Sequence, residues 1–92
     1  MKILSTYAIR PGCLKEAANR FLTGKGMQVE GAKLIGRWHR SDASGGVAVY
    51  EVENPAAFSR NALEWSDVLE VTHTPVLDDA EAGASLASVF AQ

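Results

Sequence analysis

Residues 33–53, KLIGRWHRSDASGGVAVYEVE, decide the fold of this chain, because they contain two strand-like runs separated by a polar turn. The runs Lys33–His39 and Gly46–Glu53 are rich in β-branched, aromatic and aliphatic side chains, which is typical of strands. The turn Ser41–Gly45 is polar and ends in glycine. This stretch therefore predicts a β-hairpin in the middle of the chain.

Helical patterns lie on both sides of the hairpin. The first covers about Cys13 to Leu22, and its apolar side chains fall on one helix face: Leu14, Ala17, Ala18, Phe21 and Leu22. The second begins at Asn54-Pro55, since asparagine is a good N-cap and proline suits the first helical position. Its predicted buried stripe consists of Phe58, Ala62 and Trp65.

Two further strands and a third helix complete the pattern. A strand is predicted over Lys2–Ile9 and another over Leu69–Leu77, where Pro75 indicates an edge strand or a bend. Asp78 and Glu81 have the spacing of a capping box, so a C-terminal helix is expected to begin there.

The order β-α-β-β-α-β predicts a ferredoxin-like α+β sandwich, with a four-stranded antiparallel sheet and both central helices on one face. We expect a single domain over residues 1–92. In the strand after the turn, neither alternating set is typical of a solvated surface: Val47, Val49 and Glu51 on one side, and Ala48, Tyr50 and Val52 on the other. We therefore expect a second subunit to cover the free face, giving a homodimer in the form of a dimeric α/β barrel.

Composition limits the function classes. The net charge is −2 with no basic stripe, which argues against nucleic acid as a partner. The apolar runs are too short to span a bilayer, and no signal-peptide pattern is present, so we expect no membrane partner and a cytoplasmic location. A single cysteine, Cys13, cannot form an internal disulfide or a cysteine-rich zinc site.

Several short motifs are distributed over nearly the whole chain: Thr6-Tyr7, Arg10-Pro11-Gly12, Gly36-Arg37-Trp38-His39, Gly45-Gly46, Glu64-Trp65-Ser66-Asp67 and Thr74-Pro75-Val76-Leu77-Asp78-Asp79. On these residues the chain resembles a family of short domains of unknown function in the dimeric α/β-barrel superfamily. The resemblance implies the fold but no mechanism. The wider superfamily includes monooxygenases of aromatic polyketides, haem-degrading enzymes, stress-response barrels and ligand-sensing domains, and a shared fold transfers none of these functions.

The hairpin contains the candidate catalytic residues, Arg37 and His39. They are two residues apart on one strand face, where together they are suited to hold an anionic oxygen while His39 acts as a general base. The alternatives are an exposed histidine at a strand end, and an arginine paired with a cross-strand acid such as Glu51 or Glu53.

Four residues are candidates for ligand binding: Trp38, Tyr50, Glu51 and Tyr7. The tyrosines offer hydroxyl donors, and a carboxylate in an apolar strand must be paired or shift its pKa. A salt bridge from Glu51 to Arg37 at a subunit interface is the competing interpretation. For Trp38, as for Trp65, the favoured interpretation is a core residue.

These residues support three hypotheses. The first is a homodimeric protein that binds a small apolar or aromatic molecule between sheet and helices or at the barrel mouth. The second is a cofactor-independent monooxygenase or isomerase, with His39 as base and Arg37 stabilising an enolate. The third is a structural module without a ligand. We expect no cofactor, since no nucleotide or phosphate motif is present. A metal site of His39, His73 and Glu51 is a minor alternative.

Overall fold

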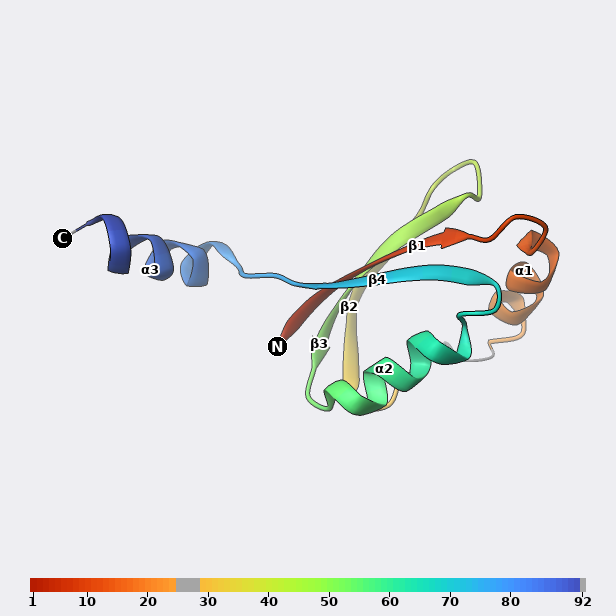
Figure 1. The fold of residues 1–92 in the computed structure, drawn as a ribbon, viewed down its shortest axis with the longest axis horizontal. Coiled ribbons are helices and arrows are strands. Elements are labelled where there is room, and N and C mark those ends of the chain that lie inside the picture. The colour runs from red at the N-terminus through yellow and green to blue at the C-terminus, as the bar shows by residue number, and fades with distance from the viewer. Residues whose placement is uncertain (25–28, 92) are drawn as a thin grey trace.

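The computed structural model describes residues 1–24 and 29–91, so the loop predicted over residues 24–31 lies partly outside the described residues. The elements follow one another as β1 (Lys2–Ile9), α1 (Leu14–Leu22), β2 (Ala32–His39), β3 (Gly45–Val52), α2 (Pro55–Glu64), β4 (Leu69–Pro75) and α3 (Asp79–Phe90). Figure 1 shows this order along the ribbon. The predicted hairpin, the β-α-β-β-α-β order and the additional C-terminal helix are confirmed.

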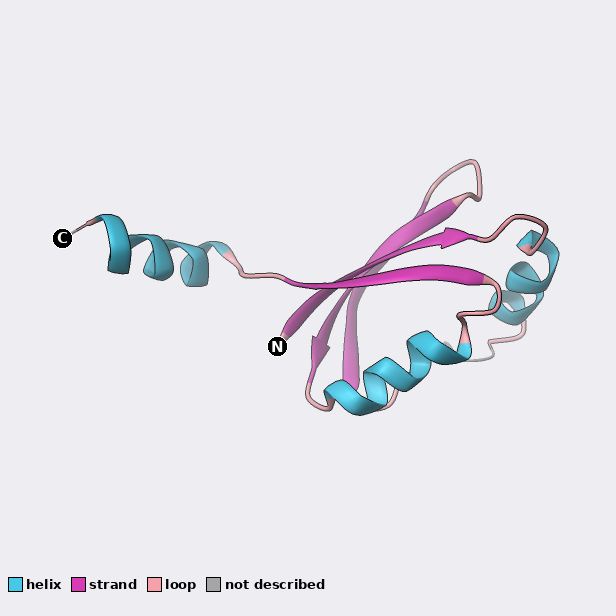
Figure 2. Cartoon of the chain, in the orientation of Figure 1, coloured by secondary structure: helices cyan, strands magenta, loops and turns pink. Residues whose placement is uncertain are grey.

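The four strands form one antiparallel sheet in the order β2-β3-β1-β4. The hairpin β2-β3 forms one half of the sheet, while β1 joins it to β4 (Figure 2). This is the arrangement of a ferredoxin-like fold. It places β2 and β4 at the edges, and the proline predicted to mark an edge strand ends β4.

Alternate residues of the strands face the two helices and form the core on that side. Ile3 of β1 is paired with Tyr50 of β3, and both are buried against Phe58 of α2, together with Ala48 and Val52. We call this the inner face of the sheet. The core forms here because β3 presents its Ala48, Tyr50 and Val52 side to the helices.

A β-bulge in β2 determines which of its side chains reach the inner face. The pairing with β3 shifts between Leu34 and Gly36, so that Arg37 lies opposite Ala48. Arg37 and His39 therefore lie on the inner face, while Trp38 lies on the opposite, outer face. Trp38 is 61% exposed, so the prediction that it is a core residue is wrong: the face it occupies does not meet the helices.

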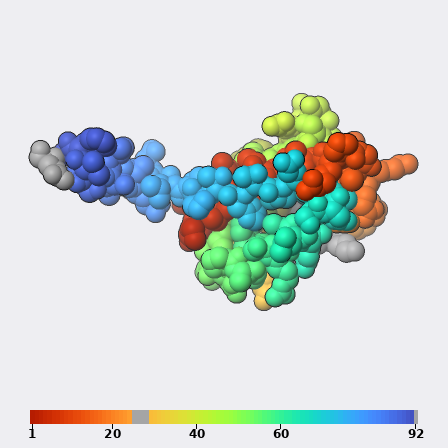
Figure 3. Space-filling view, viewed as in Figure 1, coloured from red at the N-terminus to blue at the C-terminus, as the bar shows by residue number. Residues whose placement is uncertain are grey.

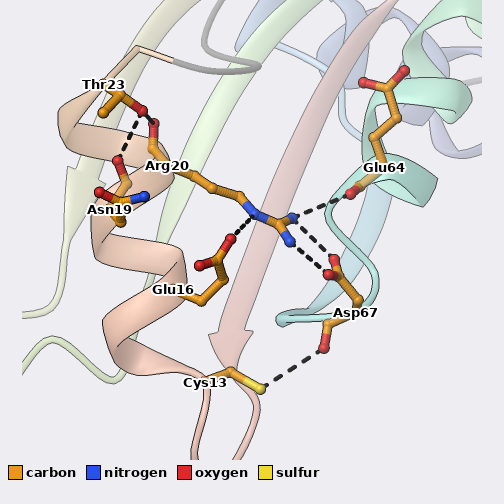
Figure 4. A network of polar contacts seen from close by, with 7 residues as sticks. All are labelled: Cys13, Glu16, Asn19, Arg20, Thr23, Glu64 and Asp67. Carbon is orange, nitrogen blue, oxygen red and sulfur yellow. Dashed lines mark hydrogen bonds and ion pairs between the residues drawn. The ribbon is translucent and has the colours of Figure 1, made fainter.

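Arg20 connects α1 to the turn that follows α2 (Figure 4). Its guanidinium binds both carboxylate oxygens of Asp67, at 3.0 and 2.5 Å, and Glu16 at 3.0 Å. The hydrogen bonds from Arg20 hold the pKa of the Asp67 carboxyl below its usual value. The same guanidinium lies 5.6 Å from the centre of the Trp65 ring. The two helices are thereby joined at one end of the layer that covers the inner face.

The predicted helix starts are confirmed in detail. Asn54 accepts a hydrogen bond from the Ala57 backbone N–H at the start of α2, and Asp78 and Glu81 form the reciprocal capping box of α3. Helix α3 extends away from the sheet and the other helices, and none of its described residues is buried (Figure 3). Within residues 1–24 and 29–91, no helix is both long and apolar enough to cross a membrane.

Candidate functional site

A cavity of about 310 Å³ lies between the inner face of the sheet and the two helices. All four strands contribute to its wall, and α1 and α2 form the opposite side. Most of the lining is apolar or aromatic, including Leu14, Ala17, Phe21, Phe58, Ala62 and Trp65. The cavity exists because small residues, Ala17 and Ala48 among them, stand where larger side chains would close the space between the layers.

Arg37 and Tyr50 form the first polar pair in this wall. They come from neighbouring strands, and the Arg37 guanidinium donates a hydrogen bond of 2.8 Å to the Tyr50 hydroxyl oxygen. Tyr50 is buried, and its ring packs edge-on against Phe58 with centroids 4.9 Å apart. Because Tyr50 is fixed by this packing, its hydroxyl holds the Arg37 head group at the cavity.

Tyr7 and His39 form the second pair, although β1 and β2 are not neighbours in the sheet. The Tyr7 hydroxyl is hydrogen-bonded to Nδ1 of His39 across β3. Gly46 of β3 lies opposite both residues, and a Cβ atom there would stand 2.5 Å from the Tyr7 oxygen. The absence of a side chain at Gly46 is therefore what allows the two rings to meet.

The His39 ring is held on a second side by Phe21 of α1, with centroids 5.0 Å apart in an edge arrangement. Burial raises the pKa of Tyr7, and the nearby Arg37 charge opposes part of that rise. Tyr7 is thus a neutral phenol at physiological pH. Its hydrogen bond to Nδ1 orients the His39 ring, and Nε2 of His39 does not take part in that bond.

His73 is a third polar group in the wall, at the β4 side. It stacks on Phe58, with centroids 4.4 Å apart, and lies opposite the buried Ser5 of β1. Burial lowers the pKa of His73, so the ring is neutral at neutral pH. A neutral imidazole offers both a donor and an acceptor to a bound molecule.

The structure brings four of the six predicted site residues to this cavity: Arg37, His39, Tyr7 and Tyr50. His39 is also exposed at the end of β2, as the alternative interpretation of this residue expected. The other two, Trp38 and Glu51, lie on the outer face. Glu51 accepts a hydrogen bond of 3.0 Å from the N-terminal ammonium of the chain, and within the chain it forms no salt bridge to Arg37. Because Arg37 and Glu51 point to opposite faces, the sheet itself separates them.

The minor metal alternative also fails on this geometry. His39 and His73 are on the inner face whereas Glu51 is on the outer face, so the three side chains do not converge. Among the described residues no three His, Cys, Asp or Glu side chains are grouped so that they could hold a metal ion.

Two contributors to the site, Gly46 and Phe21, have no sequence signal that assigns them to it. The sequence places Gly46 in a strand next to the turn and among the motifs of the family resemblance, and it places Phe21 in a helix stripe; neither pattern predicts a role at the site. The helix stripe indicates only that Phe21 faces the sheet. The role of Gly46 depends on the strand order, which places β3 between the two rings.

Comparisons with known proteins identify a family and one distant structural neighbour. Residues 1–90 match the family described as "Domain of unknown function (DUF3303)". The structure titled "Structure of Rv0793 from Mycobacterium tuberculosis" aligns with 86% of this chain and 96% of its own, at 14% sequence identity and a TM-score of 0.47. No curated protein matches. The predicted membership in a short family of unknown function is confirmed.

Proposed function

The chain belongs to the DUF3303 family of domains of unknown function, and we propose that it is a small-molecule-binding protein whose ligand lies between the sheet and helices α1 and α2. The observation that carries this proposal is the cavity itself. Its volume of about 310 Å³ is at the lower end of the range for small-molecule sites. Apolar walls with a few aimed polar groups are what such sites contain.

The polar groups support binding rather than packing. Arg37 and His39 are each held by a tyrosine, through bonds that fix their orientation at the cavity. A structural module without a ligand has no need for an unfilled space, because each missing contact in a small core lowers its stability. In a chain of 92 residues that cost is a large fraction of the total.

A neutral fluorescent probe tests the proposal. N-phenyl-1-naphthylamine is apolar, carries no charge and becomes brighter when it leaves water. We expect saturable enhancement with the wild-type protein and its loss in Ala62→Leu, which adds a branched side chain to the cavity wall. Ala56→Leu is the matched control, since it makes the same change on an exposed position of the same helix.

Loss of enhancement in both variants, or in neither, contradicts binding in this cavity. Circular dichroism of each variant establishes that the fold is retained. Absence of enhancement with the wild-type protein, at probe concentrations up to its solubility limit, contradicts the proposal as a whole.

The second part of the proposal is that the protein is a homodimer formed through the outer face. That face carries Leu4, Val47 and Val49 as well as the exposed Trp38, and no described helix covers it. A second copy is the occupant that a self-complementary sheet face fits, since a two-fold axis pairs each patch with itself. A cavity at the inner face reduces the apolar area that this small domain buries in its own core, so burial of apolar surface elsewhere becomes more important for its stability.

Sedimentation equilibrium tests the dimer. We expect a dimer for the wild-type protein and a monomer for Val49→Lys, which places a charge at the centre of the outer face. Lys33→Ala, at the edge of the same face and exposed, is expected to remain dimeric. A wild-type monomer at micromolar concentration contradicts this part and leaves the cavity proposal intact.

The Tyr7–His39 pair favours a second candidate function, a cofactor-independent enzyme that removes a proton from carbon. A histidine base must be oriented by another group, and Tyr7 supplies that contact. In this candidate His39 takes the proton from the carbon next to a carbonyl, and Arg37 stabilises the negative oxygen of the enolate.

Deuterium exchange distinguishes this candidate from simple binding. The aromatic ketone 2-tetralone loses a proton beside its carbonyl, and exchange in D2O is followed by nuclear magnetic resonance. An enzyme accelerates exchange, and His39→Gln removes the acceleration while retaining binding of N-phenyl-1-naphthylamine. Equal exchange rates with the wild-type protein and with His39→Gln contradict a base role for His39.

A further inference from the structure

We propose that the ligand of this cavity is an aromatic monoanion, whose negatively charged oxygen binds Arg37 and Tyr50 while its ring lies against α1 and α2. This inference rests on the proposed function and names the chemical class of the ligand. It follows from the sign of the charges in the wall, from the unused hydrogen-bonding capacity of two residues, and from the ring-rich lining.

The charged groups in the wall are all basic. The chain has more acidic than basic residues, 11 against 9. Nevertheless none of the cavity-lining residues described is an aspartate or glutamate, whereas Arg37 and Arg40 are both among them. Binding of an uncharged or cationic ligand would not favour a cavity wall with two guanidinium groups and no carboxylates among its described residues. The distribution indicates attraction of a negative charge.

Arg37 is the group whose charge lacks compensation. Among the described residues, Arg40 forms no ion pair with a carboxylate either, but it is exposed to water at the end of β2. Arg37 is half-buried in the wall, no carboxylate among the described residues forms an ion pair with it, and its hydrogen-bond partner is the neutral Tyr50 hydroxyl. A ligand that fills the cavity displaces water from this guanidinium, which is costly unless the ligand supplies the opposite charge.

The Tyr50 hydroxyl adds a second donor at the same point. Its oxygen accepts from Arg37, so its own hydrogen remains available for donation. The Arg37 guanidinium likewise has further N–H groups beyond the one used on Tyr50. Converging donors with no paired carboxylate among the described residues suit an oxygen with full negative charge, such as a carboxylate or a phenolate.

The rest of the wall fits a flat ring. Phe21, Phe58 and Trp65 approach the cavity from the helix side, and aromatic faces and edges of this kind pack favourably against another aromatic group. The volume of about 310 Å³ leaves room for a small ring system rather than for a long chain.

Competition between two compounds of the same shape tests the inference. 1-Naphthoate and 1-naphthamide differ in charge but share the ring, and each displaces bound N-phenyl-1-naphthylamine near neutral pH. We expect the carboxylate to bind the wild-type protein roughly tenfold or more tightly than the amide, as charge-assisted hydrogen bonds do. In Arg37→Met the ratio is expected to fall to near one.

The control is Arg60→Met, which removes an exposed arginine from α2 outside the cavity and is expected to keep the wild-type ratio. Tyr50→Phe gives a second variant that retains the ring and tests the hydroxyl donor; we expect an intermediate ratio. Binding of N-phenyl-1-naphthylamine by each variant shows that its cavity is intact.

Three results would contradict different parts of the reasoning. If the amide competes as well as the carboxylate on the wild-type protein, the anion inference is wrong and the proposed binding function stands. If N-phenyl-1-naphthylamine itself does not bind, the proposed function fails and the anion inference fails with it. If the ratio of carboxylate to amide affinity falls as far in Arg60→Met as in Arg37→Met, the preference for the anion comes from the overall charge of the protein, and the proposed role of Arg37 is wrong.

Discussion

The substitution Tyr50→Phe tests the polar pair on which the site depends, because it removes one oxygen and leaves the ring. Tyr50 is only 7% exposed, and its ring packs against Phe58. That packing is retained by phenylalanine. The loss is therefore confined to the hydrogen bond of 2.8 Å from the Arg37 guanidinium.

The expected cost follows from the nature of that bond. A hydrogen bond to a charged group contributes about 1.5–3 kcal/mol when it is buried, and a neutral one about 0.5–1.5 kcal/mol. Arg37 is half-buried, so water replaces part of the bond once the hydroxyl is gone. We expect the free energy of unfolding to fall by about 1 kcal/mol, which corresponds to a Tm lowered by roughly 4–8 °C for a domain of this size.

Urea unfolding followed by circular dichroism, at one fixed protein concentration, measures this change. A double-mutant cycle with Arg37→Met isolates the bond, since independent substitutions add within about 0.3–0.5 kcal/mol. We expect the double variant to lose less stability than the sum of the two single losses, by more than that margin. Additive losses would refute the claim that Tyr50 holds Arg37 in place.

Four further predictions concern other parts of the molecule. Gly46→Ala places a Cβ atom 2.4 Å from the Trp38 backbone oxygen and 2.5 Å from the Tyr7 hydroxyl oxygen, so urea unfolding should show a loss of about 1–3 kcal/mol. Gly83→Ala, which meets no heavy atom within 4 Å, should not destabilise the protein. Because burial depresses the pKa of His73, the unfolded chain takes up a proton more readily below about pH 6.5. The stability that the neutral His73 ring contributes is therefore fully present above that pH and is lost as the pH falls towards the folded-state pKa. Thermal unfolding across this pH range should show a smaller loss of stability in His73→Gln than in the wild-type protein. Parallel pH profiles for the two proteins would contradict this prediction. Asp78→Ala removes the N-cap of α3 and should lower the helicity measured by far-ultraviolet circular dichroism. Binding of N-phenyl-1-naphthylamine should be unchanged, because α3 buries none of its described residues. Weaker probe binding would contradict this and show that α3 supports the cavity.

The parts of the fold set by local chemistry could be predicted from the sequence. The N-cap at Asn54 and the capping box from Asp78 depend on side chains within three or four residues, and both are present as expected. The shared face of Arg37 and His39 was also predictable, since side chains two apart in a strand point the same way. These inferences needed no knowledge of which strands are neighbours.

The face that Trp38 occupies could not be predicted in the same way. It depends on the register shift between Leu34 and Gly36, and a shift of one residue exchanges the two faces of a strand. The partner of Glu51 is the N-terminal ammonium, 50 positions away in the chain. Nothing near Glu51 in the sequence indicates that contact, which arises because β1 begins beside the end of β3.

The two faces of the sheet allow dimer formation and ligand binding to be separate properties. Arg37 and Tyr50 point into the cavity on the inner face, whereas Val49, between them in the sheet, points to the outer face. A second copy on the outer face would therefore add buried apolar area without filling or blocking the cavity. The cavity lowers the stability that a domain of 92 residues can gain from its own core, and the outer face is where that loss can be offset. The proposed binding site and the proposed dimer interface therefore support each other: a domain this small can keep a cavity open if a second copy buries its apolar outer face.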